Sequence, residues 1–184
     1  MELYLIRHPR PDVAPGVCYG QSDVDIAESA ARVADRLRPL LPEAYALHSS
    51  PLQRAHKLAI ELGAPQVDDR LKEVSFGQWE GQTFEAIGEA IDAWSQDPMN
   101  FRPPEGETPL EMATRVREWM SATLDPDAPA HVVVGHGGPL RVIAGQLLGL
   151  PPERWLALDF ACGHATRIDV HAWGVMLKWF NRLH

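Results

Sequence analysis

The chain has 184 residues, of which 45% are hydrophobic and 23% are charged, so we expect one globular domain with a substantial core. Its 17 Lys and Arg residues against 25 Asp and Glu residues give a net charge of −8, which argues against nucleic acid and anionic membranes as partners. An anionic substrate would therefore need a local pocket of positive charge.

Cysteine usage and the lack of targeting signals predict a cytoplasmic protein. Cys18 and Cys162 lie far apart with no CxxC spacing, which is typical of free thiols in a reducing compartment. We see no signal-peptide pattern at the amino terminus, and no apolar run is long enough to span a membrane.

The first predicted element is a short apolar strand, residues 3–6, that ends at Arg7 and His8. Pro9 and Pro11 then prevent both a helix and further strand pairing. A parallel strand that delivers an Arg and a His to its carboxyl end points them at the crevice where open α/β sheets bind ligands. Taken alone, such a pair is more often a solvated strand end, so the rest of the chain must decide.

Two strand–helix units occupy the first sixty residues. Apolar residues recur at helical spacing over 26–41, and residues 45–49 form a second short strand. Ser50 and Pro51 resemble an N-cap and a first helical position, and the helix that follows ends at Gly63. This alternation predicts a parallel sheet with helices on its faces.

The middle of the chain is less regular. Residues 71–81 are punctuated by glycine and predict a structured loop, whereas 83–94 favour a helix. Residues 97–109 hold four prolines and predict a long loop, and loops of this length in compact domains are usually lids or binding loops. We therefore expect one domain, 1–184, with a lid insertion at about 78–109.

The clearest buried strand, residues 131–135, runs into His136, Gly137 and Gly138 and then into an apolar helix. Weakly alternating segments that suggest closing strands follow at 155–160, 165–172 and 175–180. The predicted fold class is α/β, a single-domain three-layer sandwich in which a mostly parallel sheet carries helices on both faces and a small lid insertion.

The Arg7-His8 pair and the His136-Gly137-Gly138 motif would emerge at the same edge of this sheet. A glycine-rich helix N-terminus after His136 offers free backbone N–H groups and the positive end of the helix dipole, which suits an anion. Arg54, on the helix after the second strand, can reach the same edge, and its planar guanidinium matches phosphate oxygens. With Arg7 and His8, these residues predict a pocket for one phosphate group.

Four motifs in order resemble the histidine phosphatase superfamily, which has the phosphoglycerate mutase-like fold. They are Leu5-Ile6-Arg7-His8, Ser49-Ser50-Pro51-Leu52-Gln53-Arg54-Ala55, the segment from Glu73 through Phe76, Gly77 and Trp79 to Glu80-Gly81, and Gly135-His136-Gly137-Gly138. The resemblance extends from residue 3 to about residue 180. No single motif is decisive, but four in the right order are highly specific.

The resemblance implies a mechanism and its residues. His8 would attack phosphorus to give a phosphohistidine, while Arg7, Arg54 and His136 stabilise charge on the phosphate oxygens. Gly137 would add a backbone donor at the helix N-terminus. Glu73 matches the general acid that protonates the leaving group and then serves as base for water. No metal or other cofactor is needed in this scheme.

The sequence departs from the family pattern at two positions. Pro9 stands where a Gly usually follows the nucleophilic His, and Ala14 stands where many members carry a phosphate-binding Asn. We expect Gln21 and Ser22 in the following loop to rebuild the phosphate contacts that these changes remove.

The sequence specifies the substrate and the partners less closely than it specifies the phosphate site. Residues 18–24, with the Arg10-Pro11 lead-in, resemble the α-ribazole phosphatase branch, which removes the 5′-phosphate from α-ribazole 5′-phosphate in cobalamin biosynthesis. Alternatives are a broad-specificity, sugar-phosphate or phosphohistidine phosphatase, a phosphoglycerate mutase, and a phospho-ligand binding module without activity. The expected partner is a small phosphorylated substrate, and a homodimer is possible on base rates.

Three further residues are candidates on the substrate side. Glu107 and Thr108 resemble a substrate-side loop of the family, although Thr108 with Glu111 also has the pattern of a capping box. Trp79 belongs to an aromatic set that either walls an apolar ligand or fills the core.

Overall fold

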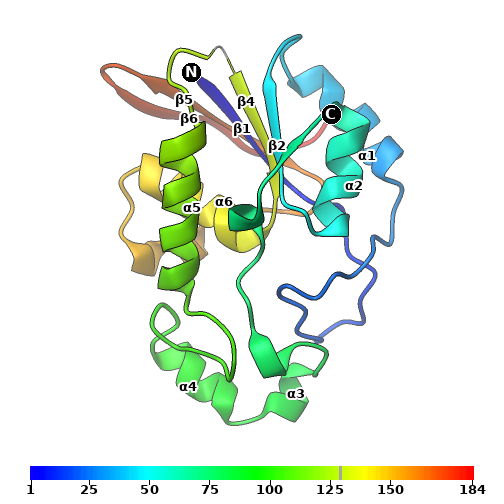
Figure 1. Cartoon of the computed structure of the whole chain (residues 1–184), viewed down its shortest axis with the longest axis vertical. Helices are drawn as coiled ribbons and strands as arrows, with labels where there is room; N and C mark the ends of the chain where they lie inside the picture. Colours follow the sequence, from blue (N-terminus) through cyan, green and yellow to red (C-terminus); the bar gives the residue numbers. More distant parts are fainter. Residues whose placement is uncertain (129) are drawn as a thin grey trace.

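The computed structural model describes residues 1–128 and 130–184, which form one six-stranded sheet in the order β3-β2-β4-β1-β5-β6 with helices on both faces (Figure 1). The strands are β1 (Glu2–Arg7), β2 (Ala46–Ser49), β3 (Gln66–Val67), β4 (Ala130–Gly135), β5 (Ala165–His171) and β6 (Gly174–Arg182). β3, β2, β4 and β1 run parallel, whereas β5 and β6 are antiparallel additions at one side. The predicted α/β fold with a mostly parallel sheet is confirmed.

The helices cover the two faces in pairs, and two short helices lie apart from the sheet at the bottom of Figure 1. Their bounds are α1 (Ala30–Leu37), α2 (Gln53–Leu62), α3 (Phe84–Ile87), α4 (Ala90–Gln96), α5 (Pro109–Thr123) and α6 (Gly137–Leu147). In β1, Leu3 and Leu5 pack with α5 and α6, while Tyr4 and Ile6 pack with α1 and α2. This alternation, with period 2, is why both faces of β1 are apolar.

Sheet register places the predicted site residues at one edge. Arg7, the last residue of β1, is paired with Gly135, the last residue of β4. His8 and His136 therefore leave the sheet side by side, each at the carboxyl end of a parallel strand. This is the edge at which open parallel sheets bind ligands.

The segment from 78 to 109 contains a broken helix and a long loop. Gly88, with φ of 64°, separates α3 from α4, so the single helix predicted over 83–94 is interrupted where the chain adopts a backbone that glycine tolerates. Trp79 is buried and stacks on Phe101, with ring centroids 5.3 Å apart. The capping box predicted at Thr108 and Glu111 is present at the start of α5.

Two local predictions are wrong. The pattern at 155–160 predicts a strand, but Pro152–Ala157 form a 3-10 helix in which the indole N–H of Trp155 donates to the Leu150 carbonyl. The helix predicted to start at Ser50 begins at Gln53 with Leu52 as its N-cap. The Ser50 hydroxyl instead lies 2.7 Å from Nε2 of His136.

Within the described part of the chain, no helix is both long enough and apolar enough to cross a membrane.

Candidate functional site

The backbone of Arg7 and His8 is hydrogen-bonded to two other segments, at Gly135 and at Gly163. The His8 N–H donates to the Gly135 carbonyl at 2.9 Å, and the Gly163 N–H lies 3.0 Å from the carbonyls of both Arg7 and His8. The His8 side chain is 1% exposed. The imidazole is thus fixed at the sheet edge and largely removed from water.

The Pro9 carbonyl sets the tautomer of His8, and burial sets its protonation state. Nδ1 of His8 lies 2.6 Å from the Pro9 carbonyl, which can only accept, so Nδ1 carries the hydrogen. Burial lowers the pKa of His8 to about 3, and the nearby charges of Arg54 and Arg7 also lower it. His8 is therefore a neutral imidazole whose Nε2 lone pair is available.

His136 faces His8 across the site. Its ring centroid lies 5.2 Å from that of His8, and it is fully buried at the N-cap of α6. Nε2 of His136 contacts the Ser50 hydroxyl at 2.7 Å. Burial holds its pKa well below the ordinary value, with smaller contributions from His8 and the arginines. This imidazole, too, is neutral near pH 7.

Two guanidiniums border the imidazoles. Arg54 is buried; its Nη1 donates to the Ser22 carbonyl at 2.8 Å and its Nη2 to the Gly20 carbonyl at 2.5 Å. Arg7 donates from Nη1 to the Phe160 carbonyl at 2.6 Å. Burial lowers the pKa of Arg54, yet an arginine remains charged in proteins. The site therefore carries local positive charge in a chain whose net charge is −8.

Several donors at this site lack a protein partner. Among the described residues, four buried side-chain nitrogens make no hydrogen bond, and three of them are Arg7 Nε, Arg54 Nε and His136 Nδ1. Buried polar groups are nearly always paired, so such a cluster calls for a specific explanation. A phosphate group carries enough acceptor oxygens to pair with nitrogens of this kind.

The Glu73 carboxylate lies against the start of α6. Its Oε1 and Oε2 accept from the Gly138 N–H at 3.1 and 3.2 Å, and Oε1 also accepts from the Val74 N–H at 3.0 Å. A Cβ on Gly138 would lie 2.2 Å from Oε1, so this approach requires glycine. These backbone donors fix the position of the Glu73 side chain at the site.

The other predicted site residues contact protein groups. The Gln21 amide donates to the Glu73 carbonyl at 3.0 Å and to the Glu107 carboxylate at 3.3 Å. The Ser22 hydroxyl donates to Glu80 at 2.5 Å, and Thr108 caps α5. Phosphate contacts by Gln21 and Ser22 therefore stay a prediction.

Two cavities meet at Glu73 and Phe76. One, of about 450 Å³, opens between the loop after β1 and residues 78–109, and its lining includes Arg7, Tyr19 and Phe84. The other, of about 270 Å³, is mostly apolar. Its lining includes Trp94, Met99, Met112, Trp155 and Leu156. A group bound near His8 would thus have apolar walls within reach on the far side of Glu73.

Arg141 is a candidate that sequence reasoning missed. Its Nε donates to the Leu158 carbonyl at 2.8 Å, and its guanidinium lines the smaller cavity beside Glu73. Its position five residues after His136, in the second turn of a helix whose side chains lean back toward the N-terminus, is the signal that would have found it.

Within residues 1–128 and 130–184, no group of three or more His, Cys, Asp or Glu side chains is arranged to hold a metal ion.

The arrangement of paired neutral imidazoles, guanidiniums and a carboxylate at a sheet edge is that of a phosphoryl-transfer enzyme. Comparison with known proteins agrees: residues 3–182 match the family model of the histidine phosphatase superfamily (branch 1). The chain belongs to that superfamily, and its activity is that of a phosphatase.

Individual relatives differ in what they are named for. The chain is 33% identical to glucosyl-3-phosphoglycerate phosphatase of Mycobacterium tuberculosis, over 85% of this chain and 79% of that protein. A solved structure of the mycobacterial enzyme superimposes with a TM-score of 0.81 at 27% identity, covering 98% of each chain. A putative α-ribazole-5′-phosphate phosphatase from Escherichia coli superimposes with a TM-score of 0.87 at 25% identity, covering 99% of this chain and 96% of that one.

Proposed function

We propose that this protein hydrolyses small phosphate monoesters in two steps through a phosphohistidine on His8. In the first step Nε2 of His8 attacks phosphorus, the bond from phosphorus to the leaving oxygen breaks, and that oxygen takes a proton from Glu73. In the second step the Glu73 carboxylate takes a proton from water, whose oxygen displaces His8 from phosphorus. Inorganic phosphate leaves and Glu73 is again protonated.

Arg7, Arg54 and His136 would stabilise the charge that spreads over the three equatorial oxygens. The observation that carries this assignment is a set of three buried nitrogens without protein partners, Arg7 Nε, Arg54 Nε and His136 Nδ1. They belong to residues that lie near the neutral His8. In a purely structural cluster at such depth, these three nitrogens would also be paired with protein groups.

For the leaving group we infer an apolar moiety, with α-ribazole 5′-phosphate as the first candidate. The smaller cavity beyond Glu73 is walled by aromatic and methionine side chains, which suit a flat heteroaromatic base. The similarity of residues 18–24 to the α-ribazole phosphatase branch supports the same substrate. In this proposal residues 78–109 act as the lid that covers the leaving group, with Trp79 held in place against Phe101.

A second candidate is glucosyl-3-phosphoglycerate, for which the Mycobacterium tuberculosis relative is named. The observation that favours it is Arg141. Its Nη2 lies 3.6 Å from the exposed Asp159 carboxylate, a loose contact that leaves the guanidinium able to bind the carboxylate of a glycerate.

A substrate panel assayed in EDTA separates these candidates. It contains α-ribazole 5′-phosphate, glucosyl-3-phosphoglycerate, 3-phosphoglycerate, a sugar phosphate and a phosphohistidine peptide. We expect the highest kcat/KM with α-ribazole 5′-phosphate. A kcat/KM at least tenfold higher for glucosyl-3-phosphoglycerate would select the second candidate, and similar values throughout would indicate a broad-specificity enzyme. Loss of all activity in EDTA would contradict the metal-independent scheme.

A further inference from the structure

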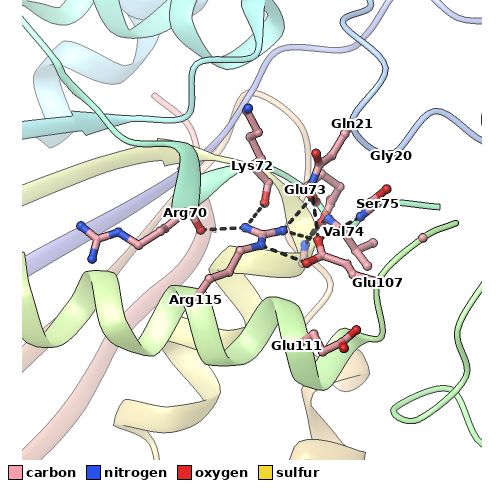
Figure 2. Close-up of polar contacts among 12 residues, drawn as sticks. Gly20, Gln21, Arg70, Lys72, Glu73, Val74, Ser75, Glu107, Glu111 and Arg115 are labelled. Carbon is pink, nitrogen blue, oxygen red and sulfur yellow. Dashed lines mark hydrogen bonds and ion pairs between the residues drawn. The ribbon is translucent and has the colours of Figure 1, made fainter. Parts of the chain in front are cut away.

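Arg115, on α5, connects that helix to the segment that carries Glu73 (Figure 2). Its Nη1 donates to the carbonyls of Arg70 and Lys72, both at 2.7 Å, and its Nη2 donates to the Glu73 carbonyl at 2.9 Å. One guanidinium thus satisfies three carbonyls of a segment that belongs to no sheet or α-helix. Without Arg115, these three carbonyls would lose a charged donor that ties the segment to α5.

The same guanidinium is paired with Glu107, at the end of the lid segment (Figure 2). Arg115 Nε and Nη2 contact Glu107 Oε2 and Oε1 at 3.1 and 2.5 Å. Glu107 Oε1 also accepts from the Ser75 N–H at 3.0 Å and from the Gln21 amide. Both charged side chains are 19% exposed, so the pair is largely shielded from solvent. A bidentate pair of this kind fixes geometry as well as adding attraction.

Glu73 is consequently held at both ends. Its carbonyl accepts from Arg115 and from Gln21, while its carboxylate accepts from the Gly138 N–H at the start of α6. The first end is anchored to α5 and the lid segment, the second to the site itself. A shift of Arg115 or Glu107 would therefore move the carboxylate relative to His8 while leaving the hydrogen bonds of Arg7, Arg54 and His136 in place.

We propose that Arg115 and Glu107 form a positioning pair that sets the reach of Glu73 toward the leaving oxygen. The inference rests on the proposed function, because it takes Glu73 as the general acid. It assigns Glu107, predicted from sequence to lie on the substrate side, to the alignment of the acid. The pair also links the lid segment to Glu73, so the lid position and proton transfer are coupled through one ion pair.

The experiment compares Glu107→Gln, Arg115→Lys and Arg115→Met with the parent on two substrates. A simple alkyl phosphate needs protonation of its leaving oxygen, whereas p-nitrophenyl phosphate does not. The readout is the ratio of kcat/KM values, which reports the steps up to phosphoenzyme formation and excludes dephosphorylation. Misplacing a catalytic group by 1 Å can cost about a hundredfold in rate, so we expect the ratio of alkyl to p-nitrophenyl phosphate to fall by about ten- to a hundredfold. The value for p-nitrophenyl phosphate should stay within about threefold.

Arg115→Lys should recover part of the loss seen in Arg115→Met, because an ammonium keeps the charge but cannot bridge three carbonyls and a carboxylate at once. Arg102→Gln is the matched control: Arg102 also joins the lid segment to α5, through Glu111, but its ion pair is exposed. We expect Arg102→Gln to leave kcat/KM for both substrates unchanged.

If the Arg115 and Glu107 variants lost kcat/KM equally on the two substrates, the proposal would be overturned. These residues would then have a structural role only. The proposal also fails if the soluble Glu107→Gln variant keeps the parent ratio. Glu73→Gln, assayed in parallel, separates failure of the positioning pair from failure of the proposed function. If Glu73→Gln lowers kcat/KM equally for the two substrates, then Glu73 is not the acid, and the proposed function has failed. If Glu73→Gln lowers the ratio but the Arg115 and Glu107 variants do not, then only the positioning pair has failed.

Discussion

At the scale of single residues, the protonation state of His8 is the feature on which the chemistry depends. Burial lowers its pKa to about 3, so the ring binds a second proton only at pH values well below neutral. We expect its NMR resonances to stay constant between pH 8 and pH 5. A His8 midpoint near its ordinary value of about 6.5 would contradict the buried, neutral nucleophile.

Glu73 is the second residue whose role can be isolated. Glu73→Gln keeps the side-chain size but removes the transferable proton, so it should lower kcat/KM for alkyl phosphates by about a hundredfold or more. Turnover of p-nitrophenyl phosphate, whose leaving group departs as a stable anion, should fall far less at the phosphorylation step. Steady-state kinetics on the two esters test this, and equal losses would mean that another group is the acid.

The residues that local motifs specify were predicted, and those that only tertiary contacts specify were not. His8, Arg54 and His136 lie in short patterns tied to strand ends and a helix start, and the structure brings all three to one edge. Arg141 and Arg115 sit in ordinary amphipathic helices. Their contacts, to Leu158 and to the carbonyls of the Glu73 segment, are set by how distant segments pack. For Arg141 the sequence offers only its place in the second turn after His136, and for Arg115 it offers no signal.

At the scale of elements, the start of α6 must let the Glu73 carboxylate approach the helix backbone. A Cβ on Gly138 would lie 2.2 Å from Glu73 Oε1, whereas a Cβ on Gly135 would meet Leu140 at an ordinary 3.7 Å. We expect Gly138→Ala to lower kcat/KM for alkyl phosphates by about a hundredfold, since the carboxylate must shift. Gly135→Ala is the control and should retain most activity; similar losses in the two variants would refute this view of α6.

The elements also show where patterns mislead. Residues 131–135 form β4 because a continuous apolar run between turn signals suits a doubly covered strand. Residues 155–160 alternate only weakly and follow two prolines. The Trp155 ring packs against Gly145, where a Cβ would lie 2.2 Å away. That packing, between segments ten residues apart, favours a tight 3-10 helix over an added strand.

At the scale of the whole molecule, three buried neutral histidines link stability to pH. Burial lowers the pKa of His48 to about 4, that of His8 to about 3, and that of His136 well below its ordinary value. In the unfolded chain these histidines bind a proton near pH 6.5, whereas in the folded chain they stay neutral to a lower pH. The free energy of unfolding is therefore highest above pH 6.5 and decreases as the pH falls toward 4. Each such histidine adds a slope of about 1.4 kcal/mol per pH unit to the free energy of unfolding.

His48 isolates this effect away from the site. Its Nε2 contacts Nδ1 of His131 at 3.0 Å between β2 and β4, and its ring packs on Trp119. Between pH 6.5 and pH 4.5, His48→Gln should lower the slope of the free energy of unfolding against pH by about 1.4 kcal/mol per pH unit. This is the contribution of one proton. Denaturant melts at several pH values measure it. An unchanged slope would show that His48 is already protonated in the folded state.

The central claim is that His8 carries the phosphoryl group, and trapping the intermediate tests it most directly. Enzyme quenched in alkali during turnover of a labelled phosphate monoester should hold acid-labile, alkali-stable phosphate, and peptide mass spectrometry should place it on His8. His8→Asn should bind inorganic phosphate yet trap none and turn over no substrate. Label on another residue, or steady-state hydrolysis by His8→Asn at more than about a hundredth of the parent rate, would contradict the account.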